Sequence, residues 1–261
     1  MILKDKVAIV TGGGLNIGLE ITRAFAREGA KVVIADICEE ESQAALKEIT
    51  AAHGDGHMFI KTDMMSEETI KHLVDTTMKA YGHIDCLINN AGIAGAQGEV
   101  ETISLEDWRT CMSINLDGIF LACKYVAPIM KSQKSGSIVN IASVTGKNPL
   151  YARVPYCASK MAVIGLTRCL ALELGMHGVR INSVCPGPVD GPRVKNISRI
   201  EAENTGRPFE EIYERFKNST PLKTLIAPTA IADACVYLCG SHGGAYMTGE
   251  DMNVCAGSVM F

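Results

Sequence analysis

The chain has 261 residues, of which 47% are hydrophobic and 21% charged, and this is enough apolar material for one large core. Its formal net charge of −4 offers no basic field for nucleic acid or anionic lipid, so we expect small molecules as partners. No apolar run reaches the roughly 18 to 20 residues that span a bilayer, and no signal peptide precedes the ten cysteines, so we expect a cytoplasmic protein with reduced core thiols.

The first 90 residues alternate short β-branched runs with longer amphipathic patterns. The runs are KVAIVT, KVVIAD, HMFIKTD and IDCLINNAG, and the patterns between them include IGLEITRAFAREG and EEESQAALKEITAAH. This alternation is typical of βαβ units in a parallel sheet. Because the runs are almost wholly apolar, we expect helices to cover both faces of the sheet.

The same alternation continues to the C-terminus. Helices are expected at about 104–131, 154–177 and 229–239, and strands at SGSIVNIAS, VRINSVCPG and near MTGEDMNVCAG. The sequence therefore predicts a single α/β domain over residues 1–261, a Rossmann fold with a doubly wound parallel sheet of seven strands. Cys235 and Cys239 lie four apart on the last helix, but no nearby Cys or His completes a four-ligand site, so we expect buried packing and no metal.

One polar segment, at about residues 188–223, does not follow this alternation of strands and helices. It carries the sequences GPR and GRPFEE and short helical patterns. It follows the sixth strand, at the carboxyl edge where doubly wound sheets bind ligands. We interpret this segment as a substrate lid.

A nucleotide-binding motif follows the first strand. In TGGGLNIGLE the missing side chains let the backbone approach a pyrophosphate at a helix N-terminus, although glycines also mark ordinary tight turns. Asp36 ends the second strand, 18 residues beyond Gly18, where a carboxylate accepts hydrogen bonds from an adenosine ribose and repels a 2′-phosphate. Leu15 and Asn16 stand where an arginine would hold that phosphate. The charges favour NAD over NADP, with a solvated strand-end carboxylate as the alternative for Asp36.

The residues expected to do chemistry are Tyr156, Lys160 and Ser143. Tyr156 and Lys160, at i and i+4, share one face of a helix. A tyrosine has an ordinary pKa of about 10 and is a poor base at neutral pH unless a neighbouring positive charge, here Lys160, favours the phenolate. Ser143 leaves the fifth strand, where its hydroxyl would hold a substrate oxygen near Tyr156. Taken singly, each residue has a plain alternative as a cap or a surface side chain.

Five motifs occur in a fixed order along the chain. They are TGGGLNIG at 11–18, Asp63 after the third strand, NNAG at 89–92, Ser143 with YCASK at 156–160, and PG at 186–187. In this order and spacing the chain closely resembles the short-chain dehydrogenase/reductase family over essentially its whole length. The resemblance implies an NAD-dependent enzyme that interconverts a secondary alcohol and a ketone. It also implies a homo-oligomer, dimer or tetramer, paired through the helices at 104–131 and 154–177.

The resemblance assigns further roles. Asn115 would be a fourth catalytic residue, supporting a water-mediated proton relay through Lys160. Asp63 would meet the adenine, and Asn89 would organise the strand end. The cofactor contacts expected in this way are Gly12, Asn16, Ile17, Gly18, Asp36, Asp63, Asn89, Ala91, Gly92, Tyr156, Lys160, Pro186, Gly187 and Val189.

The sequence departs from the family pattern at two positions. Asn16 replaces the usual middle glycine of the turn, but Asn tolerates the left-handed region better than most residues, so we expect cofactor binding to be kept. Gly191 replaces the threonine that commonly contacts the nicotinamide carboxamide, and Asp190 or the main chain would have to compensate. Pro188 and Pro192 would stiffen this entrance to the lid.

The loops expected to line the substrate pocket are polar. They carry Gln97, Lys147 and Asn148, and substrate contacts are expected from Ser143, Arg153, Asp190 and Arg193. These side chains favour a sugar, a polyol, or a hydroxy acid whose anionic group meets Arg153 or Arg193, over a bulky steroid. They could equally be solvated or hold the lid. A 3-oxoacyl thioester reductase of the same family is the alternative, and a non-catalytic NAD-binding or scaffold protein is disfavoured by the intact Ser, Tyr and Lys set.

Overall fold

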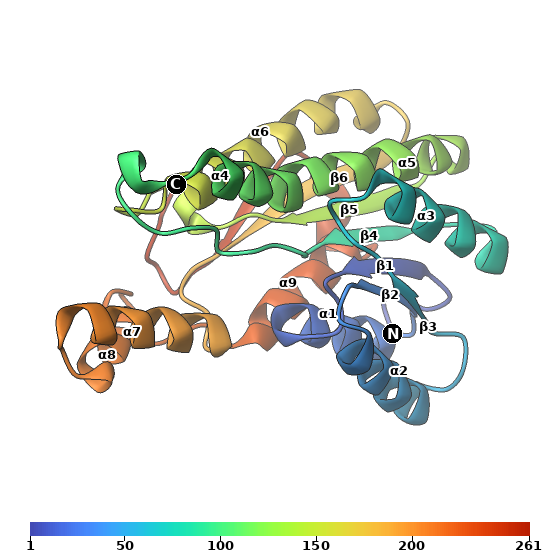
Figure 1. Cartoon of the computed structure of the whole chain (residues 1–261). Coiled ribbons are helices and arrows are strands. Elements are labelled where there is room, and N and C mark those ends of the chain that lie inside the picture. The colour runs from blue at the N-terminus through green and yellow to red at the C-terminus, as the bar shows by residue number, and fades with distance from the viewer.

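Parallel strands form a single sheet in this computed structural model, which describes the backbone of residues 1–261 and every side chain except that of Asn204 (Figure 1). The strand order is β3-β2-β1-β4-β5-β6-β7, as predicted for a doubly wound sheet. The strands are β1 Val7–Thr11, β2 Lys31–Asp36, β3 Met58–Lys61, β4 Cys86–Asn89, β5 Gly136–Ile141, β6 Val179–Pro186 and β7 Asp251–Val254. The order reverses between β1 and β4, and such a reversal leaves a ligand-binding crevice at the carboxyl ends of those strands.

Helices cover both faces of the sheet. The helices are α1 Asn16–Arg27, α2 Glu39–His53, α3 Glu67–Tyr81, α4 Leu105–Met112, α5 Gly118–Gln133, α6 Val154–Gly175, α7 Pro192–Thr205, α8 Phe209–Asn218 and α9 Pro228–Cys239. Buried side chains of α1, α2 and α9 form one apolar cluster, and those of α3, α5 and α6 form another on the opposite face (Figure 1). Successive residues of β1 enter opposite clusters, which explains why its residues are almost all apolar.

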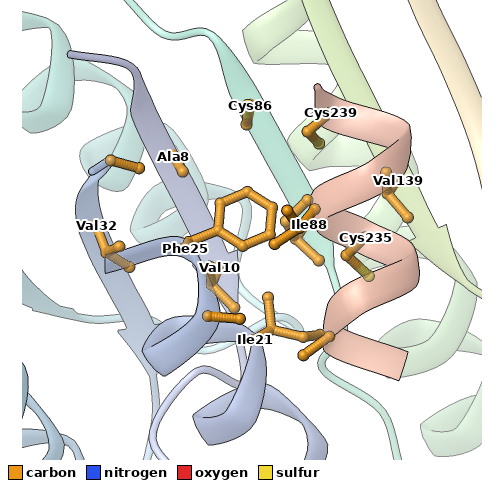
Figure 2. Packing of buried hydrophobic residues seen from close by; sticks show 14 of the residues in the cluster. Ala8, Val10, Ile21, Phe25, Val32, Cys86, Ile88, Val139, Cys235 and Cys239 are labelled. Atoms are coloured by element: carbon orange, nitrogen blue, oxygen red, sulfur yellow. The ribbon is translucent and has the colours of Figure 1, made fainter. Parts of the chain in front are cut away.

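The first of these clusters centres on Phe25 of α1, which has no exposed surface. Figure 2 shows its ring between β1 and α9, close to Ile88 of β4. Cys235 and Cys239 of α9 belong to the same cluster, which confirms their predicted buried packing. Full burial of one such large side chain contributes about 1.5–3 kcal/mol.

The helix expected at 104–131 is divided in two. Between α4 and α5 the backbone widens into a π-helical turn, η2 Ser113–Asp117, and Asn115 lies in it with no exposed surface. Such wide turns inside helices are frequent at functional sites, because they redirect one side chain. Among the described helices, none combines the length and the apolar character that a membrane crossing needs.

The segment at 188–223 contains α7 and α8, which extend away from the sheet at the lower left of Figure 1. Arg215 of α8 donates to both carboxylate oxygens of Glu201 on α7, at 2.8 and 2.6 Å. Val189 forms an isolated parallel bridge with Ile226, so the two ends of the segment are held together.

Candidate active site

The glycine-rich turn packs directly against the NNAG segment after β4. A Cβ atom on Gly18 would lie 1.8 Å from the carbonyl oxygen of Gly12, and one on Gly12 would lie 3.0 Å from the Cα of Ala91. Only glycine allows Gly18 this approach, and Gly12 also has a φ of +61°. Asn16 takes the left-handed conformation expected of it, with a φ of +50°.

Two residues that the sequence analysis did not single out hold this turn. Asn90 donates from Nδ2 to the carbonyl oxygens of Thr11, at 3.1 Å, and Gly12, at 3.0 Å. The hydroxyl of Thr11 accepts from the backbone N–H groups of Asn90 and Ala91, at 3.0 and 3.1 Å. Since β1 and β4 are parallel neighbours, a polar residue at each strand end was the available signal.

Asp36 lies at the end of β2, beside the turn. Its Oδ2 accepts from the backbone N–H of Gly14 and its Oδ1 from that of Cys38, both at 3.0 Å. The side chain is 8% exposed, and a carboxylate oxygen with one such bond retains a second lone pair for another donor. Burial raises the pKa of the Cys38 thiol, and the charges of Asp36 and Glu41 raise it further. Glu41 therefore adds a second negative charge close to this turn.

The other expected cofactor residues lie along the same sheet edge, but the side chain of one of them is fully buried. Asp63 follows β3, and its Oδ1 accepts from the backbone N–H of Met65 at 2.9 Å. Gly187 follows β6 and donates its N–H to the carbonyl oxygen of Val254 at 3.0 Å. Asn89, by contrast, has no exposed surface and donates from Nδ2 to Asn140 Oδ1 at 2.8 Å. Its side chain therefore joins the ends of β4 and β5 inside the protein.

The remaining expected cofactor residues lie where these elements meet. Ile17 packs against the apolar cluster around Phe25, at the start of α1. Gly92 lies between two polar side chains, because a Cβ atom there would be 3.0 Å from Asn115 Oδ1 and 3.6 Å from Lys160 Nζ. Pro186 is the last residue of β6, and Val189 starts the segment that leads to α7.

Tyr156 and Lys160 lie one turn apart on α6. Lys160 is 3% exposed, and its Nζ donates to the carbonyl oxygen of Ile141 at 2.7 Å. The same Nζ lies 5.8 Å from the centroid of the Tyr156 ring. Burial, and behind it the charge of Arg193, lowers the pKa of Lys160 to about 7. The lysine is therefore poised to gain or lose a proton near neutral pH.

Ser143 stands just beyond β5, two residues after the carbonyl that holds Lys160. Its Oγ accepts from the N–H and the hydroxyl of Thr145, at 3.2 and 3.0 Å. Because both of these bonds are accepted, the serine's own proton remains available for an oxygen in the crevice. The short helix η3, Val144–Gly146, packs so closely on α6 that a Cβ on Gly146 would lie 2.8 Å from the Lys160 carbonyl group.

Asn115 makes hydrogen bonds to two neighbouring segments, and its Oδ1 keeps one lone pair free. Its Oδ1 accepts from the N–H of Ile93 at 2.8 Å, and its Nδ2 donates to the Ile93 carbonyl at 3.0 Å and to Ser159 Oγ at 3.1 Å. The wide η2 turn is thus fastened to the loop after β4 and to α6.

The polar residues expected in the substrate pocket fall into two groups. Arg153 is 8% exposed, with its guanidinium carbon 5.2 Å from the Tyr156 ring centroid, and Arg193 donates to the Gly92 carbonyl at 2.8 Å. Asp190 is turned to the lid, where its Oδ1 accepts from Tyr213 at 2.9 Å. Lys147 points away from both groups and contacts β7 and the C-terminus.

The expectation that Lys147 lines the pocket is wrong. Its Nζ lies 2.6 Å from Asp251 Oδ2 and donates to Asn253 Oδ1 at 2.9 Å and to the carbonyl of Phe261 at 2.7 Å. This side chain ties the loop after β5 to β7 and the C-terminus. The partner carboxylate is 104 residues away in sequence, so no local pattern could have indicated it.

This chain is similar to known proteins over most of its length. A family model described as short chain dehydrogenase matches residues 6–202. A putative ketoacyl reductase from Streptomyces coelicolor is 36% identical over 257 residues, which make up 97% of this chain and 97% of that protein.

Solved structures show the same likeness. A structure of actinorhodin polyketide ketoreductase with NADPH superposes with a TM-score of 0.93 at 34% identity, covering 98% of each chain. The NAD+-bound structure of a xylitol dehydrogenase superposes with a TM-score of 0.93 at 28% identity, covering 98% of this chain and 100% of that one.

The chain belongs to the short-chain dehydrogenase/reductase family. It is an oxidoreductase of alcohols and ketones that works with a nicotinamide cofactor, which confirms the predicted fold and reaction class.

Proposed function

We propose that this enzyme uses NAD to interconvert a secondary alcohol and a ketone on a small polar substrate, with Ser143, Tyr156 and Lys160 handling the proton. The observation that carries the proposal is the bond between Lys160 and the Ile141 carbonyl. This bond holds the buried Nζ of Lys160 5.8 Å from the centroid of the Tyr156 ring. The accepting residue, Ile141, stands two residues before Ser143. An isolated helical tyrosine and lysine would have no reason to be tied to the end of a strand in this way.

The chemistry follows from the charges. Protonated Lys160 stabilises the phenolate of Tyr156, which then accepts the proton of a substrate hydroxyl, and in the reverse direction the phenol returns that proton to the ketone oxygen. Ser143 donates a hydrogen bond to the same oxygen and orients it. A bound nicotinamide supplies the hydride acceptor or donor. We assign to Asn115 the role of holding the water through which Lys160 exchanges its proton with solvent.

The residues present fit a dinucleotide. Gly12 and Gly18 allow the tight turn that leads into the N-terminus of α1, where backbone N–H groups can receive a pyrophosphate. Asp36 supports NAD over NADP, because a 2′-phosphate beside this carboxylate would meet like charge, and Glu39, Glu40 and Glu41 begin the next helix. Of the similar solved structures, one contains NADPH and another NAD+, so structural similarity alone does not distinguish between the two cofactors.

We further propose that α7 and α8 act as a lid over the substrate. The segment leaves the carboxyl edge of the sheet directly after Gly187, and Arg193 at its start reaches the carbonyl of Gly92 beside Lys160. The lid therefore touches the NNAG motif at the residue beside Lys160, within a single domain over residues 1–261.

We also retain the expectation of a homo-oligomer that pairs through α5 and α6. Phe120 on α5 is 49% exposed, Leu172 on α6 is 84% exposed, and Met176, directly after α6, is 83% exposed. Large apolar side chains exposed together support an interface.

A cytoplasmic location remains part of the proposal. Its support is the state of the cysteines, since all ten are free thiols and most are buried. Disulfides are favoured in oxidising compartments, so a chain with this many unpaired cysteines suits a reducing one.

A 3-oxoacyl thioester reductase is the second candidate function. The observation that favours it is the similarity to the putative ketoacyl reductase of Streptomyces coelicolor. Such an enzyme would act on a thioester and would be expected to use NADPH, which the carboxylate of Asp36 disfavours.

The testing experiment follows the absorbance of the reduced nicotinamide, with NAD and NADP in parallel, over polyols, sugars, hydroxy acids, simple secondary alcohols and hydroxyacyl thioesters. We expect turnover of a polar alcohol with NAD, at least about 100-fold above that with NADP, and its loss in Tyr156→Phe. In Asp36→Ser the ratio of turnover with NAD to turnover with NADP should fall, because the carboxylate that repels the 2′-phosphate is removed. Turnover only with NADP would overturn the role of Asp36, and turnover only of thioesters would favour the second candidate.

A further inference from the structure

Arg153 is a buried cation without an anion. The side chain is 8% exposed, and no Asp or Glu among the described side chains lies within ion-pair distance of it. Its Nε is buried and has no hydrogen-bond partner. Charged groups are rarely buried unless they are paired, because removing them from water is costly. This arginine therefore lacks the partner that its burial requires.

The contacts that Arg153 does make use little of its capacity. Nη2 donates to the carbonyl oxygen of Ala94 at 3.1 Å, which accounts for one of five N–H donors. The guanidinium carbon lies 5.2 Å from the centroid of the Tyr156 ring, a contact that leaves the edge donors free. A purely structural role in holding the Ala94 loop would not explain the buried, unpaired Nε.

The neighbouring charges are also positive. Arg193 lies close enough for its charge to lower the pKa of both Arg153 and Lys160, although burial is the larger cause in each case. Arg193 itself is bonded to a neutral group, the Gly92 carbonyl. Arg153 and Lys160 flank the Tyr156 ring, and Arg193 adds its charge beside them, so the field at this point favours an anion.

We propose that the substrate carries a carboxylate, and that Arg153 binds it, with Arg193 closing over it from the start of the lid. A planar guanidinium with free edge donors matches the two oxygens of a carboxylate. Arg153 is the N-cap residue of α6, three residues before Tyr156, and its guanidinium lies against the Tyr156 ring, so the carboxylate and the reacting carbon belong to one small molecule. The substrate class is a short-chain hydroxy acid and its oxo acid. This inference rests on the proposed function, and it narrows the polar substrate to one that is anionic.

A binding measurement tests the inference without turnover. Butyrate and its uncharged isostere butyramide are titrated calorimetrically into the enzyme saturated with NAD. We expect butyrate to bind at least about 10-fold more tightly than butyramide. In Arg153→Met the affinity for butyrate should fall about 100-fold, with that for butyramide unchanged. Arg109→Met, which removes a positive charge from an exposed position on α4, is the matched control and should bind like the wild type.

The kinetic readout separates recognition from chemistry. For short 2- and 3-hydroxy acids, Arg153→Met should raise KM far more than it lowers kcat, whereas the corresponding hydroxy amides should show no such difference. If Arg153→Met does not fold, Arg153→Lys serves instead, and we expect it to weaken butyrate binding at least about 10-fold because the planar fork is lost.

Equal binding of butyrate and butyramide to the wild type would overturn the proposal, as would carboxylate selectivity that survives in Arg153→Met or Arg153→Lys. A loss of kcat for acids and amides alike would overturn it too, since Arg153 would then act on Tyr156. The two proposals fail separately. Selective butyrate binding without oxidation of any alcohol by NAD would refute only the proposed function. NAD-linked turnover of neutral alcohols without butyrate binding would refute only the proposal that the substrate carries a carboxylate.

Discussion

Lys160 donates from Nζ to the carbonyl oxygen of Ile141 over 2.7 Å, and this buried bond joins α6 to the end of β5. The bond fixes the lysine against Tyr156 and leaves Ser143 two residues beyond the accepting carbonyl. One contact between two distant elements therefore sets the relative positions of all three residues that we propose for proton transfer.

Lys160→Met should remove the charge while keeping most of the buried volume. We expect kcat/KM for alcohol oxidation to fall by about 10²–10⁴-fold, because the phenolate of Tyr156 loses its positive neighbour. The acidic limb of the pH–rate profile for oxidation, where the rate falls as the phenolate is protonated, should move to higher pH for the same reason. Steady-state rates across the pH range are the measurement, with Lys79→Met on α3 as a control that removes a lysine charge far from the site. An unchanged pH profile in Lys160→Met would contradict this role.

The stability of the protein should also report on Lys160. The ordinary lysine pKa of 10.5 applies in the unfolded chain, whereas burial lowers it to about 7 in the fold. Between these values the unfolded chain binds more protons, so the wild type gains stability as the pH rises. Relative to Lys160→Met, the gain between about pH 7 and about pH 9 should be about 2 kcal/mol. Urea unfolding of both proteins without cofactor measures this gain, and parallel pH dependences would refute the lowered pKa of Lys160.

The sheet was predictable because its strands and helices are specified locally. Val7 and Ala8 are both apolar since each faces a helical layer, and the long connecting patterns allow only a parallel arrangement. The η2 turn was not predictable. The sequence around Asn115 continues a helical pattern, and the wide turn is held by bonds to Ile93, 22 residues earlier.

In the site, too, features set by local sequence were predictable, and features set by contacts between distant residues were not. The motif residues Tyr156 and Lys160 are recognisable from their spacing, because a helix brings i and i+4 together. The support given by Asn90 to Thr11 spans 79 residues, and only the pairing of β1 with β4 brings the two together. The assignment of Lys147 failed for a similar reason, since its partner Asp251 belongs to the last strand.

Gly18→Ala should disrupt cofactor binding. The new Cβ would lie 1.8 Å from the Gly12 oxygen and 2.6 Å from Asn90 Nδ2, so the turn must open. We expect the Kd for NAD to rise at least about 10-fold and the midpoint of thermal unfolding to fall. Gly165→Ala on α6 is the matched control, because its Cβ meets nothing within 4 Å, and it should stabilise the helix by about 0.5–1 kcal/mol. Similar NAD affinities in the two variants would show that the turn does not approach the cofactor.

Gly191→Thr should strengthen cofactor binding. The backbone at Gly191 is extended, with a φ of 166°, and an added Cβ would meet nothing within 4 Å, so a threonine fits without strain. Its hydroxyl would restore the carboxamide contact that the family commonly makes, and one hydrogen bond of about 1 kcal/mol lowers Kd about fivefold. Gly191→Ala adds the same Cβ without the hydroxyl and should bind NAD like the wild type. Equal Kd values for the alanine and threonine variants would mean that no such contact forms.

The proposed lid should be the first part of the chain to open. The α7–α8 pair is held by few buried apolar side chains, among them Val194 and Ile212, and by the exposed ion pair between Arg215 and Glu201. Segments with so little buried contact open at low free energy, and residues 192–218 contain several sites for trypsin. We expect limited proteolysis to cut there before any other helix.

Ligands that the lid covers should protect it. If NAD and a bound substrate or carboxylate stabilise the closed segment, a ligand concentration of about ten times Kd should slow this cleavage about tenfold. Arg168 on α6 provides an internal reference, since cleavage beside it requires opening of the main sheet layer and should remain slower throughout. Mass spectrometry of early fragments locates the cuts. A first cut outside 192–218, or a rate that ligands leave unchanged, would show that α7 and α8 do not close over the site.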